Sequence, residues 1–212
     1  MSLRSFAEKI GGLLHRALTF AFPCRFPFSR HGMYSQIEAA AKDLKLSGHA
    51  LSISHSQPLL KILGADCSAV SEANYPDVTI FSLPFPDATF DVVVSDQVFE
   101  HVDGLPSDAM NETFRVLKPG GWVLHTTCFH TPYHGPGDFW RFTAEGLADL
   151  ARRAGCDQVK AATHGHPLHL IASFLGWRRL LVPVSTKHPL NWFANLNWPS
   201  QGAMVWVLAR KS

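Results

Sequence analysis

The sequence predicts an α/β fold in which a doubly wound, mostly parallel sheet carries helices on both faces. From residue 48 onward, short apolar runs alternate with amphipathic segments, and short turns join them. The run from Asp91 to Ser95 has three consecutive valines, which is typical of a parallel strand covered on both faces. A chain of 212 residues with 46% hydrophobic residues is also long and apolar enough to bury one core.

The charged residues are distributed unevenly, although the formal net charge is only +2. Residues 1–61 hold eight Lys and Arg against three acidic residues, residues 62–149 hold three against thirteen, and residues 150–212 hold eight against one. An acidic middle segment argues against a general nucleic-acid-binding protein, in which a basic surface would run through the fold. The four cysteines are widely spaced, which favours a reduced protein in the cytoplasm.

Residues 1–47 are expected to form a helical extension ahead of the main domain. Residues 3–18 follow the i, i+3, i+4 spacing of an amphipathic helix, with basic side chains outside the apolar stripe. Such a helix could pack over the domain edge, or it could lie on the inner face of a membrane through residues 1–20. A second helix is expected at residues 34–46. No apolar run reaches eighteen residues, so we expect no transmembrane helix.

Residues 48–212 are expected to form one domain, with an irregular and partly helical insertion at about residues 164–200. Helices are expected at residues 58–64, 106–117, 144–154 and 168–180. Strands are expected at residues 49–54, 67–71, 78–81, 91–95, 122–127, 158–163 and 203–209. Pro58 suits the first turn of a helix, and Thr143 suits an N-cap. The segment Lys118-Pro-Gly-Gly121 is expected to end a helix and to turn the chain into the next strand.

In open parallel sheets, ligands bind outside the carboxyl ends of the strands, so the residues after each strand are candidates for a site. Glu72 stands 18 residues after Ser54, the end of the first predicted strand. This spacing lets a carboxylate accept hydrogen bonds from both hydroxyls of a nucleoside ribose. A solvated acidic residue in a turn would explain Glu72 equally well.

A series of short motifs runs through the middle of the chain. It comprises Leu83-Pro-Phe, Phe90-Asp, Glu100-His, Leu117-Lys-Pro-Gly-Gly and Asp138-Phe-Trp-Arg-Phe-Thr. Over roughly residues 48–163 the chain thereby resembles class I S-adenosyl-L-methionine-dependent methyltransferases of the type 11 group. The resemblance implies a Rossmann-like methyltransferase sheet, mostly parallel with an antiparallel last strand, and S-adenosylmethionine as cofactor. Where that family usually carries a Gly-x-Gly-x-Gly turn, this chain has a glycine-free variant, Ser52-Ile-Ser-His-Ser-Gln-Pro.

The resemblance also implies cofactor contacts for particular residues. By the resemblance, the methionine moiety would contact Ser54, His55 and Ser56, and the ribose would contact Glu72. The adenine would contact Phe81, Ser82 and Leu83. The floor beneath the sulfonium would be formed by Ser95, Asp96 and Gln97. If the acceptor must lose a proton, the candidates for a catalytic base are His101, His130 and His134. Candidates for contact with the acceptor are Tyr133, Trp140 and Arg141.

Some of these residues also have purely structural explanations. His101 could hold a loop by hydrogen bonding, and the Trp-Arg motif could supply a buried Trp140 and an ion pair from Arg141. The histidines at positions 164, 166 and 169 lack the spacing and the additional ligands of a metal site, so no metal is expected.

Two classes of function remain open. One is a methyltransferase that acts on a small-molecule or lipid- or sugar-type acceptor. The other is a non-catalytic, methyltransferase-like binding or scaffold protein, with membrane association as a further option. The glycine-free turn discriminates between them, because cofactor binding depends on how closely the backbone can approach the ligand there.

Overall fold

The computed structural model describes residues 22–212. The amphipathic helix and the membrane contact predicted within the first 20 residues lie outside the described residues. The described part of the chain forms two compact units, one of residues 22–36 with 163–204 and one of residues 37–162 with 205–212.

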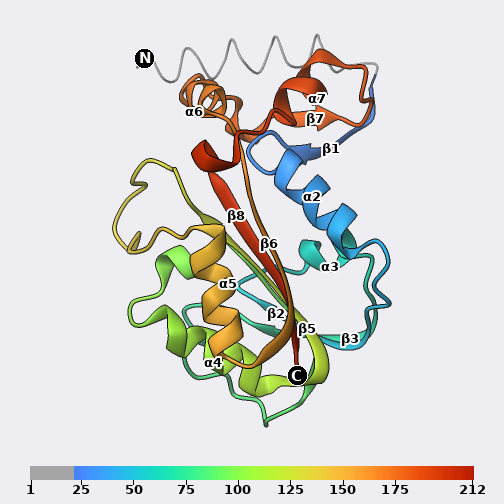
Figure 1. The fold of residues 1–212 in the computed structure, drawn as a ribbon, viewed down its shortest axis with the longest axis vertical. Coiled ribbons are helices and arrows are strands. Elements are labelled where there is room, and N and C mark those ends of the chain that lie inside the picture. The colour runs from blue at the N-terminus through green and yellow to red at the C-terminus, as the bar shows by residue number, and fades with distance from the viewer. Residues whose placement is uncertain (1–21) are drawn as a thin grey trace. The chain divides into compact units, whose positions relative to one another are not determined.

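A six-stranded sheet has the strand order β3-β2-β4-β5-β8-β6 (Figure 1). Its strands are β2 (Ser47–Ile53), β3 (Asp66–Ala73), β4 (Phe90–Asp96), β5 (Leu117–Cys128), β6 (Cys156–His164) and β8 (Met204–Lys211). β2 pairs in parallel with β3 and β4, and β4 pairs in parallel with β5. The doubly wound, mostly parallel sheet predicted from the sequence is therefore confirmed.

The last strand runs antiparallel to its neighbours, which confirms this part of the prediction. The side-chain Nζ of Lys211, at the end of β8, donates a hydrogen bond over 2.7 Å to the carbonyl of Leu117, the first residue of β5. The amide of Ser212 donates to the carbonyl of Gly155, directly before β6, over 3.0 Å. The carboxyl end of β8 thus lies beside the amino ends of both neighbours.

Helices cover both faces of this sheet. α4 (Pro106–Val116) and α5 (Ala144–Arg153) contact each other on one face, and α3 (Pro58–Ile62) packs against β4 on the other (Figure 1). α5 begins as predicted, because the hydroxyl of Thr143 accepts a hydrogen bond from the amide of Gly146 over 3.0 Å. These helices and the strands between them enclose a core that includes the fully buried Val93 and Phe99.

The strand predicted at residues 78–81 is wrong, and turns occupy the segment instead. The amide of Val78 donates to the carbonyl of Asn74, and the amide of Ser82 donates to the carbonyl of Thr79. Because these amides are used in local turns, they are not available for a ladder with a neighbouring strand.

The segment Lys118-Pro-Gly-Gly121 lies inside β5, and this strand begins earlier than predicted. In the ladder with β4, Leu117 pairs with Phe90 and Trp122 pairs with Val92, so four residues of β5 lie opposite Asp91 alone. Gly120 has a left-handed φ of +79° within this bulge.

The other compact unit contains a two-stranded antiparallel sheet of β1 (Cys24–Pro27) and β7 (Leu181–Pro183). α6 (Pro167–Phe174) and α7 (Pro189–Ala194) also belong to this unit. The helix predicted to reach residue 180 ends at residue 174, because Gly176 adopts a left-handed φ of +86°. The helix predicted at residues 34–46 is α2 (His31–Ala41), which starts and ends earlier.

Candidate cofactor and acceptor site

The carboxyl ends of four parallel strands meet at one edge of the sheet. Ile53, the last residue of β2, pairs with Ala73 of β3 and with Ser95 of β4. Asp96, the last residue of β4, pairs with Thr126 near the end of β5. The residues that follow these strands are therefore brought together, as the fold class predicts.

The turn after β2 has the backbone shape of a glycine turn without containing glycine. Ser54 and His55 have φ values of 52° and 60°, which lie in the left-handed region that residues other than glycine rarely adopt. The amide of Ser54 donates over 2.9 Å to the carbonyl of Ala73, and the amide of His55 donates over 2.9 Å to Oδ1 of Asn74. The end of β3 thus holds both strained residues in place.

Ser56 joins the same turn to β4. Ser56 is only 1% exposed, and its hydroxyl donates a hydrogen bond to the carbonyl of Ile53. The same hydroxyl accepts a hydrogen bond from the amide of Asp96 over 2.7 Å. The side chain of Ser56 therefore fixes the distance between two strand ends.

Glu72 lies at the end of β3 with an exposed side chain. Oε2 of its carboxylate accepts a hydrogen bond from Nδ2 of Asn74 over 2.8 Å. Oε1 of Glu72 has no hydrogen-bond partner among residues 22–212, so one carboxylate oxygen remains available to a ligand. Sequence reasoning gave Asn74 no role, although an amide side chain directly after a strand at this edge was a usable signal.

The three residues predicted to line the floor lie in different environments. Ser95 is fully buried, and its hydroxyl is 2.8 Å from Nδ1 of His125. Burial lowers the pKa of His125 to about 3, so this ring is neutral in the core. Asp96 and Gln97 lie at the strand edge, where both form hydrogen bonds with the hydroxyl of Thr126.

The segment predicted to contact adenine is partly core. Leu83 is buried, and its amide donates over 2.7 Å to Oε1 of Glu112. Phe81 is half-buried and lies so close to Gly104 that a Cβ added there would be 2.9 Å from the Phe81 ring. Ser82 is exposed.

The structure brings together two of the three candidate bases. The rings of His101 and His134 form an edge contact, with centroids 5.2 Å apart. His130 lies apart from them and stacks on Phe129, with ring centroids 3.8 Å apart. Tyr133 is largely exposed on the same loop.

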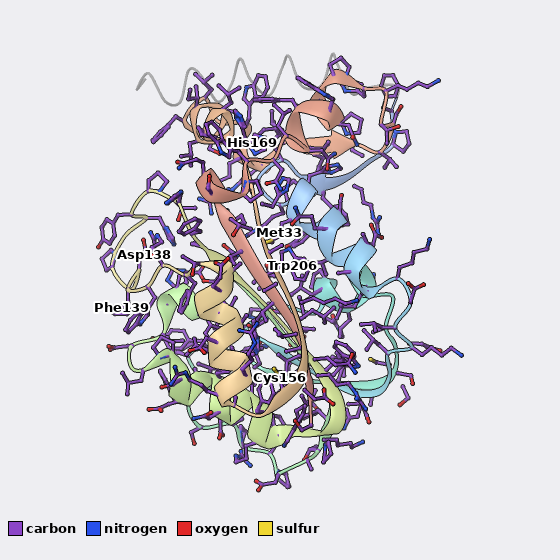
Figure 2. All side chains as sticks on the ribbon, viewed as in Figure 1. Met33, Asp138, Phe139, Cys156, His169 and Trp206 are labelled. Carbon is purple, nitrogen blue, oxygen red and sulfur yellow. The ribbon has the colours of Figure 1, made fainter. Side chains whose placement is uncertain are left out.

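Asp138 anchors the loop between β5 and α5, where Figure 2 labels it beside Phe139. Arg141 donates to both carboxylate oxygens of Asp138, over 2.5 and 2.6 Å. This bidentate pairing lowers the pKa of Asp138 to about 2. Trp140 is partly exposed, and its Nε1 donates to the carbonyl of Val102 over 3.0 Å. Arg141 thus forms the ion pair considered from the sequence, whereas the indole is not fully buried.

Residues 35–125 match the family described as the methyltransferase domain. The match and the fold together support a class I S-adenosylmethionine-dependent methyltransferase domain in this part of the chain. S-Adenosylmethionine is the cofactor of such domains, and the mostly parallel sheet with an antiparallel last strand is their fold. The resemblance stated from the sequence motifs is therefore confirmed.

Curated relatives of the methyltransferase domain match it over short stretches. A probable S-adenosylmethionine-dependent methyltransferase of Mycolicibacterium smegmatis is 40% identical over 76 residues, which are 32% of this chain and 29% of that protein. An uncharacterized methyltransferase of Schizosaccharomyces pombe is 51% identical over 45 residues, which are 21% of this chain and 16% of that protein. The chain thus matches less than a third of the length of each of these relatives.

Solved structures share the fold at low sequence identity. A methyltransferase of Thermotoga maritima, described as a possible histamine N-methyltransferase, has a TM-score of 0.52 at 18% identity, with 98% of each chain covered. Phosphoethanolamine N-methyltransferase 2 of Haemonchus contortus, solved with S-adenosyl-L-methionine, has a TM-score of 0.56 at 14% identity and covers 100% of this chain and 60% of that one. The [4+2]-cyclase SpnF has a TM-score of 0.52 at 16% identity, with 97% and 96% covered. At these identities the likeness concerns the fold alone.

Proposed function

We propose that the protein transfers a methyl group from S-adenosylmethionine to a small-molecule or lipid- or sugar-type acceptor. One observation carries the proposal: the left-handed turn at Ser54 and His55 is joined through Asn74 to the carboxylate of Glu72. A glycine-like backbone and a free carboxylate oxygen at adjacent strand ends suit the two polar parts of this cofactor.

The residues at this edge have separate tasks in the proposed complex. The backbone at Ser54 and His55 would lie against the methionine moiety, and the free Oε1 of Glu72 would accept a hydrogen bond from the ribose. When bound, the cofactor supplies an electrophilic methyl group on a sulfonium. Direct displacement needs little acid–base chemistry, so the main work of the protein is to hold donor and acceptor in line and to exclude water.

The loop between β5 and α5 would form the acceptor side. It is anchored by the pairing of Asp138 with Arg141, and His130, Tyr133, His134 and Trp140 extend along it. His101 and His134 lie together, so they are the first candidates to take a proton from an acceptor hydroxyl or amine. His130 remains a candidate by its position on the same loop.

Binding of S-adenosylhomocysteine separates this proposal from a non-catalytic scaffold. A ligand at about 100 times its dissociation constant stabilises a fold by about 2.7 kcal/mol, which a thermal-shift assay detects. We expect this shift for the full chain, no shift for Glu72→Ala, and a wild-type shift for Asp77→Ala, which removes a neighbouring exposed carboxylate. If the folded wild-type protein shows no shift at millimolar ligand, the methyltransferase proposal fails. If Glu72→Ala binds like wild type, the assignment of Glu72 to the ribose fails.

The acceptor class needs a second measurement. Incubation with methyl-labelled S-adenosylmethionine, followed by extraction, separates label in lipid from label in free small molecules or sugars. We expect label in one of these fractions, and none when Glu72→Ala is used. Strong ligand binding without any transferred label would favour the scaffold.

We further propose that the insertion contacts an anionic membrane surface. Leu168, Ile171, Phe174 and Leu175 are exposed at helical spacing along α6 and the residue after it, and Arg178 and Arg179 follow. Apolar side chains flanked by cations suit anionic lipid headgroups. No helix among residues 22–212 is long and apolar enough to cross a bilayer.

Co-sedimentation with vesicles that contain phosphatidylserine tests this contact. We expect the full chain to pellet and the double variant Ile171→Ser, Phe174→Ser to remain largely in solution. Leu105→Ser removes an apolar side chain of similar exposure in the other compact unit, so it is a control that should pellet like wild type. Equal pelleting of all three proteins would remove α6 from the membrane contact.

A further inference from the structure

Three groups that commonly bind metal ions converge at the carboxyl ends of β4 and β5. One potential ligand atom each from Glu100, His101 and His134 lie within 4.8 Å of one another. Glu100 and His101 belong to the 3₁₀ turn Phe99–His101 after β4, and His134 belongs to the loop that follows β5. Neighbours in sequence and a distant loop residue therefore meet at one point.

A contact at Nδ1 orients the ring of each of the two histidines, His101 and His134. Nδ1 of His101 lies 2.6 Å from the carbonyl of Gly137, and Nδ1 of His134 lies 3.2 Å from Oδ2 of Asp138. A histidine that binds a metal usually donates its other ring N–H to a carbonyl or carboxylate, which fixes the ring and leaves a lone pair for the metal. In the described part of the chain, Nε2 of both rings has no hydrogen-bond partner.

The third group is a buried carboxylate. Glu100 is 1% exposed, and its two oxygens accept hydrogen bonds from Thr127 Oγ1 over 2.7 Å and from Cys128 Sγ over 3.3 Å. Within residues 22–212 it forms no salt bridge with Lys or Arg; the guanidinium of Arg141 interacts with it electrostatically but pairs with Asp138. Neutral donors only partly compensate a buried negative charge, so a cation beside Glu100 would stabilise it.

We propose that Glu100, His101 and His134 bind a divalent transition-metal ion. Two imidazoles and one carboxylate suit Zn²⁺, Co²⁺ or Fe²⁺, whereas Mg²⁺ and Ca²⁺ prefer sites built of oxygen ligands. Both histidines are exposed, which leaves coordination positions open to a ligand from solution. The spacing of the histidines at positions 164, 166 and 169 predicts no metal, whereas Glu100, His101 and His134 are brought together only by the fold.

A metal here would change the roles of the two rings. As ligands they would not take a proton themselves, and an acceptor oxygen bound to the ion would lose its proton more readily. This consequence for the acceptor rests on the proposed methyltransferase function. The binding of the ion does not rest on it, so the two proposals can fail separately.

Cobalt binding to the full chain, carrying no histidine tag, tests the site. After removal of metals with a chelator, we expect one Co²⁺ per chain with visible absorption bands, displacement by Zn²⁺ and no displacement by Mg²⁺. His101→Ala and His134→Ala should each weaken binding by about 100-fold or more, whereas His130→Ala, on the same loop, should bind like wild type. Circular dichroism and S-adenosylhomocysteine binding on the same samples show whether each variant is folded.

Two outcomes would overturn the site. The first is a wild-type chain that binds no Co²⁺ at millimolar concentration. The second is a folded His134→Ala variant that binds the ion as tightly as His130→Ala does. Glu100→Gln provides an independent check, because it keeps the shape of the side chain and removes the charge, and we expect it to weaken Co²⁺ binding as well.

Discussion

Asn74 donates a hydrogen bond over 2.8 Å to the carboxylate of Glu72. The oxygen of the same amide accepts the hydrogen bond from the backbone of His55, over 2.9 Å. The side chain of Asn74 therefore orients Glu72, the residue predicted to bind the ribose, and also supports the strained turn after β2. The two halves of the proposed cofactor site are mechanically connected through it.

Replacing Asn74 tests that connection. Asn74→Ala removes one hydrogen bond to a charged group, worth about 1.5 kcal/mol or more, so we expect S-adenosylhomocysteine affinity to fall about tenfold by calorimetry. Asn74→Asp should bind still more weakly, because it keeps an acceptor for His55 but places a like charge beside Glu72. An aspartate variant with wild-type affinity would contradict this role.

The left-handed turn makes an unusual stability prediction. A residue other than glycine in this region costs about 1–2 kcal/mol, and the side chain of His55 is exposed. His55→Gly should therefore raise the free energy of unfolding by about 0.5–1 kcal/mol in urea titrations. Gln57→Gly is the matched control, because Gln57 has a right-handed φ of −48°, and it should lower stability. A destabilised His55→Gly variant would mean that the imidazole contributes contacts of its own.

Acid should destabilise the protein through His125. Its folded-state pKa is lowered by burial to about 3, below its usual value of 6.5, so the unfolded chain binds the proton first as pH falls. The stabilising contribution is complete above pH 6.5 and is lost progressively towards pH 3. Between pH 7 and pH 5 we expect a loss of about 2 kcal/mol from this residue in urea unfolding. The variant His125→Gln should show a correspondingly smaller change over the same pH interval.

The bidentate pair of Arg141 and Asp138 should be sensitive to conservative replacement. The side chain of Asp138 is 1% exposed, and lysine cannot donate to both of its oxygens in the same plane. Arg141→Lys should therefore cost about 2 kcal/mol of unfolding free energy. Arg153→Lys, in an exposed pair with Asp149, should cost less than about 0.5 kcal/mol in the same assay. Equal losses in the two variants would show that the partly buried Arg141–Asp138 pair contributes no more to stability than the exposed pair.

The elements predicted best from the sequence are those whose signals are local. Continuous valines identify β4, and Thr143 and Pro58 place helix starts. The strand predicted at residues 78–81 fails because its amides bond locally, and β5 begins early because a bulge accommodates Gly120 and Gly121 within the ladder. Neither feature is visible in the apolar pattern alone.

The candidate site divides in the same way. Glu72 can be proposed from spacing alone, because its place depends only on the ends of two strands, and its role in the site stays a prediction. The links from Asn74 to His55 and from Glu100 to Thr127 join residues that are far apart in the chain, and only the fold brings them together. A sequence motif specifies which side chains stand at positions 54 and 55. The main structural property of Ser54 and His55 is instead their left-handed backbone φ, which the motif does not specify.

A ligand that approaches the turn after β2 meets backbone amides and carbonyls, whose orientation depends on the φ and ψ angles and not directly on the residue types. Glycine is one way to reach those angles, and Ser54 and His55 reach them with support from β3. In this chain the left-handed backbone conformation occurs without the glycines by which such turns are normally recognised. A glycine-free sequence can therefore provide the backbone that the proposed cofactor site needs, because the amide of Asn74 holds His55 in place.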